Sequence, residues 1–167
     1  MEKNLNDAAA PKKLQELADK IRVCMFITKP EEEQSSRPMA TVKAEDDGTL
    51  WFYTKQSSGK TDQIEQDHDV HLVYADPSSH SYMDIWGKAQ IVTDKAKIKE
   101  YWSPFVKAWF PGGVDDPEIC LLKVKPQSAY YWDSDTGKMV SFFAMIASAV
   151  TGKRLVEGKE GELNVGG

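Results

Sequence analysis

The chain has 167 residues, of which 41% are hydrophobic and 28% are charged, so one compact domain is expected and disorder is excluded. The chain has 21 Lys and Arg residues and 26 Asp and Glu residues, and the resulting net charge of -5 argues against nucleic acid as the main partner. The longest apolar run, 139–150, is far shorter than the roughly 20 residues that cross a bilayer, so no membrane contact is expected. Because the first residues contain no apolar signal core, a cytoplasmic location is expected.

The first half of the chain begins with a helix and continues with strands. We expect a flexible N-terminus over 1–10 and a single domain over 11–165. Apolar residues at helical spacing after Pro11 predict an amphipathic helix over 11–21. Short apolar or alternating runs then predict strands over the ranges 21–28, 39–44 and 50–54. A hairpin turn at Asp46-Asp47-Gly48 joins the last two, because Gly accepts positive φ.

The second half continues the same alternation of strands and short helices. A short helix is expected over 60–66, and Asp94 is expected to cap a second helix that contains Ile98, Tyr101 and Trp102. Further strands are expected over 70–74, 82–92, 119–124 and 129–132. The apolar segment 139–150 predicts a buried or partner-facing helix, and the tail 154–167 predicts one frayed strand.

Six or seven short strands with few, peripheral helices favour a closed or nearly closed β-barrel, that is, a mainly β fold with flanking helices. The sequence contains neither a G-x-G-x-x-G segment nor a Walker A segment. A Rossmann dinucleotide site or a P-loop is therefore not supported.

The segment 51–60 (WFYTKQSSGK) has the composition of a phosphate-binding turn. A strand ends here in hydroxyl side chains, and a helix then begins next to Lys60. Hydroxyl donors, backbone N–H groups at a helix start and one lysine together bind a phosphate well. Through the hairpin, Arg37 and Lys43 could flank the same turn and supply further positive charge. The alternative is a polar surface turn after a strand, which spacing alone supports equally.

The order of these residues resembles a known family. Tyr53-Thr54, Ser58 and Lys60, followed by Gln63-Ile64, resemble the FMN-binding signature of the pyridoxamine 5'-phosphate oxidase-like split barrels. Further segments are similar to the subgroup called general stress protein 26, namely 37–39, 47–52, 82–87 and 126–132. The resemblance covers roughly residues 12 to 165.

The resemblance implies a six- to seven-stranded split barrel, a homodimer and FMN as the cofactor, with FAD as the alternative flavin. The residues that would face the FMN phosphate and ribityl chain are Arg37, Lys43, Tyr53, Thr54, Ser58 and Lys60. Met39, Ala40 and Thr41 would lie along the edge of the isoalloxazine ring, and Trp132 of a second protomer would contact the ring. A cleft between two chains can cover both faces of a large, flat ring.

The sequence also departs from the oxidases of this family. These oxidases carry an Arg-x-His element shortly after the Trp, whereas this chain has residues 133–138 (DSDTGK) and then an apolar segment. Pyridoxamine phosphate oxidation is therefore disfavoured. The Arg37–Lys43 spacing is also one residue longer than in the oxidases, so the assignment of Arg37 is weaker than that of Lys60.

Three functions remain open at this point. The first is a stress-related, flavin-dependent oxidoreductase that acts on an unidentified small molecule or a nicotinamide cofactor, with no catalytic side chain assigned. The second is a non-catalytic flavin store or sensor that acts through partner contacts. The third is a flavin-free barrel that mediates interactions.

A metal site and a reactive thiol are the remaining chemical hypotheses. His68, Asp69 and His71 could suggest a metal, but positions i and i+3 of a strand point to opposite faces, so none is expected. Cys24 and Cys120 lie in apolar runs without a CxxC partner, and we expect both to be buried and inert.

Overall fold

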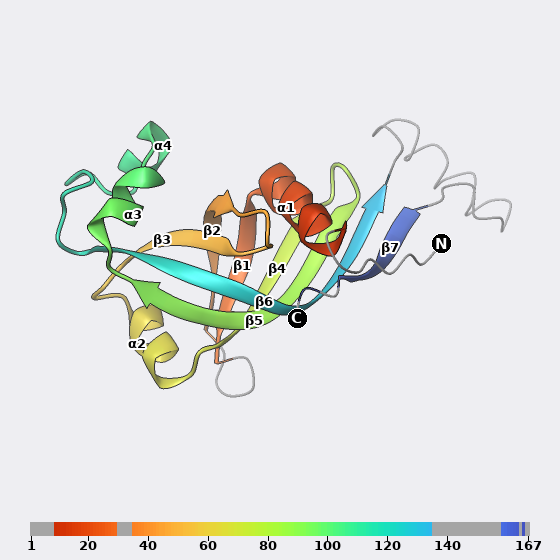
Figure 1. The fold of residues 1–167 in the computed structure, drawn as a ribbon, viewed down its shortest axis with the longest axis horizontal. Helices are drawn as coiled ribbons and strands as arrows, with labels where there is room; N and C mark the ends of the chain where they lie inside the picture. Colours follow the sequence, from red (N-terminus) through yellow and green to blue (C-terminus); the bar gives the residue numbers. More distant parts are fainter. Residues whose placement is uncertain (1–8, 30–34, 135–157, 164, 166–167) are drawn as a thin grey trace, which may run out of the picture.

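The computed structural model describes residues 9–29, 35–134, 158–163 and 165, and every structural statement below concerns these residues. The fold is mainly β (Figure 1). Its strands are β1 (Val23–Thr28), β2 (Ser35–Ala44), β3 (Leu50–Lys55), β4 (Asp69–Asp76), β5 (Ser81–Val92), β6 (Ile119–Ser134) and β7 (Gly158–Leu163). Its helices are α1 (Ala9–Ile21), α2 (Gly59–Gln66), α3 (Lys95–Glu100) and α4 (Pro104–Lys107). In these ranges no helix has the length and apolar character needed to span a membrane.

The strands form a closed barrel. Neighbouring strands in the sheet follow the order β3-β2-β1-β4-β5-β6-β7. An additional pairing between β3 and β6 closes the six strands from β3 to β6 in this order into a ring. All of these pairings are antiparallel. Strand β7 lies outside the closed ring and pairs only with the last third of β6, from Ala129 to Ser134. The sequence-based expectation of a split barrel with flanking helices is confirmed.

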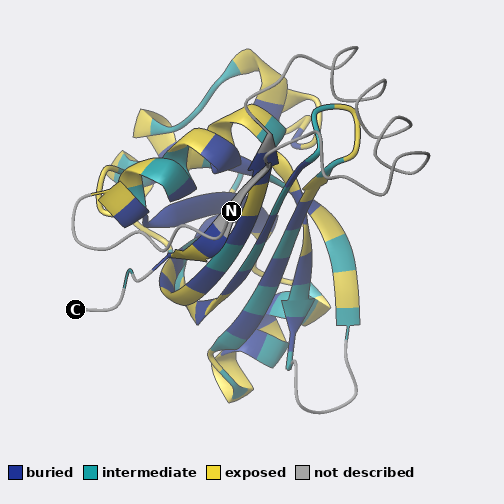
Figure 2. Ribbon diagram, turned by 90° about the vertical axis from the view of Figure 1, so that its right-hand side faces the viewer, coloured by how far each residue is buried: buried dark blue, intermediate teal, exposed yellow. Residues whose placement is uncertain are grey.

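Successive side chains of the strands point alternately into the barrel and out of it, which separates an inner core from an outer layer. Phe26 and Phe52 point into the barrel and meet edge to face, with ring centroids 5.2 Å apart. Trp51 and Tyr53, on the opposite side of β3, pack under α3 and α4 in a second apolar cluster. Figure 2 shows this alternation as buried and exposed bands along the strands. Leu50 and the three aromatic residues of β3 are therefore all buried, although β3 has two sides.

The antiparallel registers give the barrel two distinct ends. Helix α1 covers the end where β2 finishes and β5 begins: Leu14 and Leu17 are buried there, and Gln15 Nε2 donates to the Ala44 carbonyl at 2.9 Å. Helix α2 follows β3 directly and covers the other end, where β1 finishes and β2 begins. Figure 1 shows α1 and α2 well separated.

Three details of the elements differ from the sequence-based prediction. The predicted strands 119–124 and 129–132 are one continuous strand, β6, because the β5–β6 register shifts at Trp86/Gly87 and accommodates Pro126 without a ladder N–H. Strand β2 begins at Ser35, four residues before the predicted start. Asp94 caps α3 as predicted, but α3 ends at Glu100, and Pro104 begins a separate helix.

Other elements agree with the prediction or lie outside the described residues. Helix α1 matches the predicted helix and begins two residues earlier, at Ala9. Helix α2 begins one residue before the predicted start, and β7 lies within the predicted C-terminal strand. The predicted helix 139–150 and residues 1–8 of the predicted flexible N-terminus lie outside the described residues.

Candidate functional site

Polar side chains line the inside of the barrel at the end covered by α2. Thr28, Arg37 and Thr54 occupy inward-facing positions near this end of β1, β2 and β3, and the residues two positions deeper on each strand belong to the core. Helix α2 adds Lys60 and Gln63 from above. We call this cluster the basic mouth; its members are Thr28, Arg37, Thr54, Ser58, Lys60, Thr61 and Gln63.

A chain of hydroxyl groups runs from Lys60 through the turn. Lys60 Nζ donates to Thr54 Oγ1 at 2.7 Å, and Thr54 Oγ1 lies 3.2 Å from Ser58 Oγ. Ser58 Oγ lies 2.8 Å from Thr61 Oγ1, which donates to the Lys55 carbonyl at 3.0 Å. Because each hydroxyl has one proton, the donors all point from Lys60 toward that carbonyl. The turn is therefore held in one conformation by its own side chains.

Among the described residues, Arg37 donates only to uncharged acceptors. Its Nη1 donates to Thr28 Oγ1 at 3.0 Å, and its Nη2 donates to Gln63 Oε1 at 3.3 Å and to Ser35 Oγ. The guanidinium group is thus positioned by hydroxyl and amide oxygens from β1, β2 and α2, none of which neutralises it.

Burial disfavours the charged form of both cations of the basic mouth, and the charge of Arg37 adds to this effect at Lys60. Burial lowers the pKa of Arg37. Burial also lowers the pKa of Lys60, and the positive charge of Arg37 lowers it further. Within the described ranges neither cation lies at ion-pair distance from a carboxylate. Two partly buried like charges without an anion form a site that is electrostatically prepared for an anionic ligand.

The start of α2 adds backbone donors next to these cations. The N–H groups of Gly59 and Lys60 have no acceptor in the described part of the chain, and the Ser58 side chain does not cap the helix. The first N–H groups of a helix bind anions readily, because they are unpaired and carry the positive end of the helix dipole.

The structure brings together four of the six residues predicted to contact a phosphate: Arg37, Thr54, Ser58 and Lys60. Lys43 is not among them. It pairs with Trp51 at the opposite end of β3, where it lies beside Glu45, Asp46 and Asp47. Tyr53 points to the other side of β3, and its hydroxyl donates to the Ile98 carbonyl at 2.5 Å.

Sequence reasoning missed the roles of Thr28, Thr61 and Gln63. Gln63 follows Lys60 by three positions, so both lie on one face of α2, and this spacing is a signal that the sequence contains. The contribution of Thr28 depends on the β1–β2 register and has no local signal.

The residues predicted to contact the flavin ring are divided between two places. Met39 and Thr41 point into the core, where Thr41 Oγ1 lies 2.6 Å from the Tyr74 hydroxyl, and only Ala40 of this segment faces outward. Trp132 is 40% exposed near the far end of β6. It lies twelve residues along β6 from Cys120, the partner of Thr54, which is roughly 40 Å of extended strand. One chain therefore does not bring Trp132 to the basic mouth.

An apolar surface covers the outside of the barrel between Ala40 and Trp132. We call it the outer face; its apolar members include Val23, Met25, Pro38, Ala40, Val73, Tyr82, Trp86 and Trp132, from five adjacent strands. Val23 and Met25 are 48% and 41% exposed. Exposed apolar surfaces of this kind are common at interaction sites.

The sequence was compared with known proteins, and the family model described as pyridoxamine 5'-phosphate oxidase like matches residues 9–156. The chain belongs to the pyridoxamine 5'-phosphate oxidase-like family. Solved structures similar to this chain include proteins named for general stress protein 26.

Three relatives illustrate the similarity. Protein bli-3 of Neurospora crassa is 32% identical over 139 residues, which cover 77% of this chain and 66% of that protein, just under two thirds of its length. The general stress FMN/FAD binding protein of Xanthomonas citri is 25% identical, with a TM-score of 0.66, over 77% of this chain and 90% of that one. General stress protein 26 of Bacillus anthracis is also 25% identical, with a TM-score of 0.64, over 72% and 92%.

The structure also bears on the two other chemical hypotheses, a reactive thiol and a metal site. Both cysteines are buried as expected, and burial raises the pKa of Cys24 to about 12 and that of Cys120 to about 11. Neither thiol is therefore prepared for reaction at neutral pH. Among the residues with described positions, no three His, Cys, Asp or Glu side chains are arranged to hold a metal ion.

Proposed function

We propose that this protein is a homodimeric FMN-dependent oxidoreductase of the general stress group, which transfers electrons or hydride between the flavin and a small molecule or nicotinamide cofactor. The observation that carries the proposal is the pair of adjacent cations, Arg37 and Lys60, which lack a carboxylate partner in the described ranges. The flavin binding named for the Xanthomonas citri relative supports the same cofactor class.

The donors of the basic mouth fit a terminal phosphate. A phosphate monoester carries between one and two negative charges at neutral pH and several strong acceptor oxygens. Lys60 and Arg37 would neutralise it, while Thr54 and Ser58 would redirect to the phosphate the hydroxyl protons that they donate within the turn. The free N–H groups of Gly59 and Lys60 would complete the site. Bound FMN supplies reversible electron or hydride transfer at its ring, and this chain anchors and orients it.

The distance between the two parts of the predicted site supports the proposal of a homodimer. If Trp132 contacts the ring of a flavin whose phosphate is anchored at Lys60, the two residues must come from different chains, because β6 holds them far apart in one chain. The outer face offers the apolar surface for such an assembly, with Ala40 near one of its edges and Trp132 near the other. A dimer would also shield the flavin ring from water.

The first experiment measures flavin binding. The purified protein is titrated with FMN and with riboflavin, and absorbance near 450 nm and flavin fluorescence are recorded. Lys60→Ala is expected to weaken FMN binding by about ten- to a hundredfold, because a charge-assisted contact contributes roughly 1.5 to 3 kcal/mol. Riboflavin, which has no phosphate, should bind equally to both proteins. Lys55→Ala, at an exposed position of the same turn, is the matched control and should bind FMN normally.

The second experiment measures turnover. NADH or NADPH is added to the FMN-loaded protein without oxygen, and the bleaching of the flavin band is followed, then its return in air. Bleaching supports the oxidoreductase. A protein that binds FMN without being reduced by either donor is instead a flavin store or sensor. If the wild-type protein binds no FMN, the whole proposal is wrong and an interaction role remains.

A further inference from the structure

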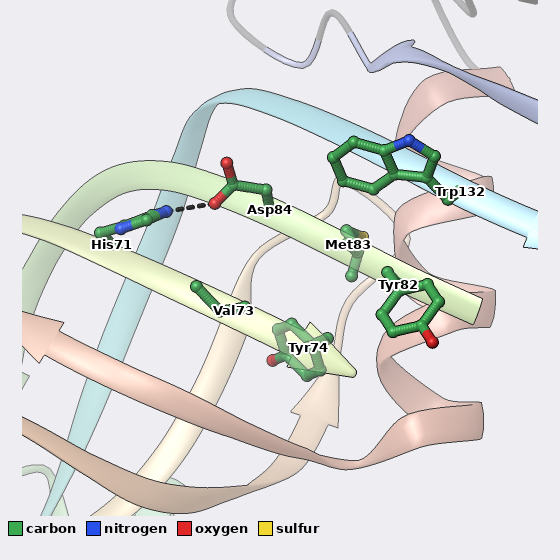
Figure 3. Close-up of a pocket in the computed structure, with 7 residues that line it drawn as sticks. All are labelled: His71, Val73, Tyr74, Tyr82, Met83, Asp84 and Trp132. Atoms are coloured by element: carbon green, nitrogen blue, oxygen red, sulfur yellow. Dashed lines mark hydrogen bonds and ion pairs between the residues drawn. The ribbon is translucent and has the colours of Figure 1, made fainter. Parts of the chain in front are cut away.

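A hollow of about 470 Å³ lies on the outer face, where β4, β5 and β6 run side by side (Figure 3). We call it the ring pocket. Its lining includes Val73 from β4 and Tyr82 and Trp132, which are register partners in β5 and β6. Its volume and largely apolar lining are typical of small-molecule sites. Its residues are different from those of the basic mouth.

The aromatic wall of the ring pocket is fixed in position. The rings of Trp132 and Tyr130 contact each other at 4.7 Å between centroids, with an interplanar angle of 52°. The Trp132 indole nevertheless stays 40% exposed. A flat ring can therefore stack on it with little loss of conformational entropy, since the indole is already held by its neighbour.

The polar end of the ring pocket is a carboxylate held by a histidine. His71 Nε2 donates to Asp84 Oδ1, and the His71 ring stacks on Trp86 at 4.2 Å with an angle of 12°. Figure 3 shows Asp84 between His71 and Trp132. Asp84 Oδ2 has no hydrogen-bond partner in the described ranges, and the side chain is 37% exposed. One oxygen of Asp84 is thus fixed while the other is available as an acceptor.

The charge around the ring pocket selects among aromatic ligands. Neither Lys nor Arg is among the residues that line it. An aromatic carboxylate or phosphate placed on Trp132 would therefore meet the negative charge of Asp84 without a Lys or Arg side chain to compensate it. A ring that carries N–H donors or a positive charge would gain a charge-assisted hydrogen bond to Asp84 and a favourable contact with the indole.

We propose that the ring pocket binds the substrate of the flavoprotein, a flat aromatic ring that packs against Trp132 beside the flavin ring and donates an N–H group to Asp84, and that it rejects aromatic anions. In the proposed dimer the ring pocket would lie at the contact between the protomers, where Trp132 would touch both rings. Because this proposal names the class of substrate, it rests on the proposed function as an oxidoreductase. Asp84 is the specificity-determining residue, and His71 is the positioning residue that holds its carboxylate in place. No bond is made or broken in this binding step.

The test uses three probes of nearly the same shape that differ in charge: benzamidine, benzamide and benzoate. Each is titrated into the FMN-loaded protein, and the change in the visible flavin spectrum and in tryptophan fluorescence is recorded. Benzamidine is expected to bind at least tenfold more tightly than benzoate, with benzamide between them. Asp84→Asn should weaken benzamidine about tenfold and abolish the discrimination against benzoate.

Three further variants separate specificity from folding. His71→Phe preserves a flat ring on Trp86 without the N–H donor and should weaken benzamidine about threefold. Trp132→Leu should weaken all three probes together, since the stacking surface is lost. Asp115→Asn, which changes a carboxylate in the exposed loop before β6, is the matched control and should leave the order unchanged.

The proposal is overturned if benzoate binds as tightly as benzamidine, if Asp84→Asn retains the wild-type order, or if no probe binds. The two Asp variants should bind FMN as tightly as the wild type does. A difference between Asp84→Asn and Asp115→Asn in probe affinity therefore does not reflect a difference in flavin binding. If the wild-type protein binds no FMN, the proposed function fails, and tryptophan fluorescence of the flavin-free protein still reports whether the ring pocket discriminates among the probes.

Discussion

Arg37 and Lys60 lie near each other at the end of the barrel that α2 covers, so that burial and the guanidinium charge both lower the pKa of the Lys60 ammonium group. This arrangement opposes folding of the empty protein and favours binding of an anion. Ligand sites often contain such locally unfavourable groups, because the ligand supplies the missing interaction.

We predict that Lys60→Met stabilises the flavin-free protein by about 0.5 to 1 kcal/mol at pH 7. The pKa of Lys60 in the folded state lies below the ordinary 10.5, so the charged form destabilises the fold at neutral pH. In the wild type this penalty is relieved as the pH rises through the folded-state pKa. Urea unfolding at pH 7 measures the difference, and a Lys60→Met protein clearly less stable than the wild type would contradict the prediction.

Inorganic phosphate should act in the opposite sense. Phosphate that binds the basic mouth is expected to raise the melting temperature of the wild type and to have little effect on Lys60→Met, since a ligand stabilises only the state it binds. Chloride at equal ionic strength is the control. Equal shifts with the two salts, in both proteins, would show that the cations do not form an anion site.

Gly87 is required for close contact between β5 and β6. An added Cβ would lie 2.6 Å from the Lys125 carbonyl oxygen, next to the register shift that accommodates Pro126. Gly87→Ala should therefore destabilise the protein by about 2 to 3 kcal/mol. Gly59→Ala is the matched control, because nothing lies within 4 Å of its Cβ position, and its stability should be unchanged or slightly higher. Thermal unfolding followed by circular dichroism compares the two.

Asp133 connects α1 to the barrel and should make stability depend on acid pH. Burial alone raises its pKa, but hydrogen bonds from Lys13 (2.5 Å) and Ser81 (2.7 Å) and the nearby positive charges outweigh burial, so the net pKa is lowered from 3.8. A lowered folded-state pKa gives stability that is present above 3.8 and lost as the pH falls through the folded value.

Asp133→Asn is expected to reduce the free energy of unfolding by about 2 to 4 kcal/mol at pH 7, because it leaves Lys13 without its buried partner. The difference from the wild type should shrink below pH 3.8, where Asp133 itself becomes protonated. Glu16→Gln removes the exposed partner of the same lysine and should change stability little. Urea unfolding at several pH values measures the stability difference between Asp133→Asn and the wild type. If this difference does not change with pH, the ionic explanation is excluded.

Met25 tests the proposed assembly through the outer face. Its side chain is 41% exposed, so Met25→Glu should leave each chain folded while placing a charge in the proposed dimer contact. We expect the dimer to dissociate into monomers in analytical ultracentrifugation and flavin affinity to fall. Trp109→Glu alters a residue that is 69% exposed elsewhere and should stay dimeric. A wild-type protein that sediments as a monomer would disprove the homodimer.

The local pattern of residues determined most of the elements and part of the site. Apolar periodicity located α1 and the core strands, and the hydroxyl-rich turn before Lys60 predicted an anion site, because turn, helix start and donors lie within a few consecutive residues. The sequence did not predict that β6 continues through Pro126, because this continuity depends on a shift in the register between β5 and β6.

Only the tertiary structure decided which distant residues share the site. Lys43 follows Arg37 closely in the sequence, yet the length of β2 places the two at opposite ends of the barrel, while Thr28 arrives beside Arg37 through the β1–β2 pairing. The pair His71–Asp84 likewise exists only because β4 and β5 are antiparallel and in this register. Contacts within a turn follow from local chain geometry, whereas contacts between strands depend on how the whole sheet closes, which no short segment specifies.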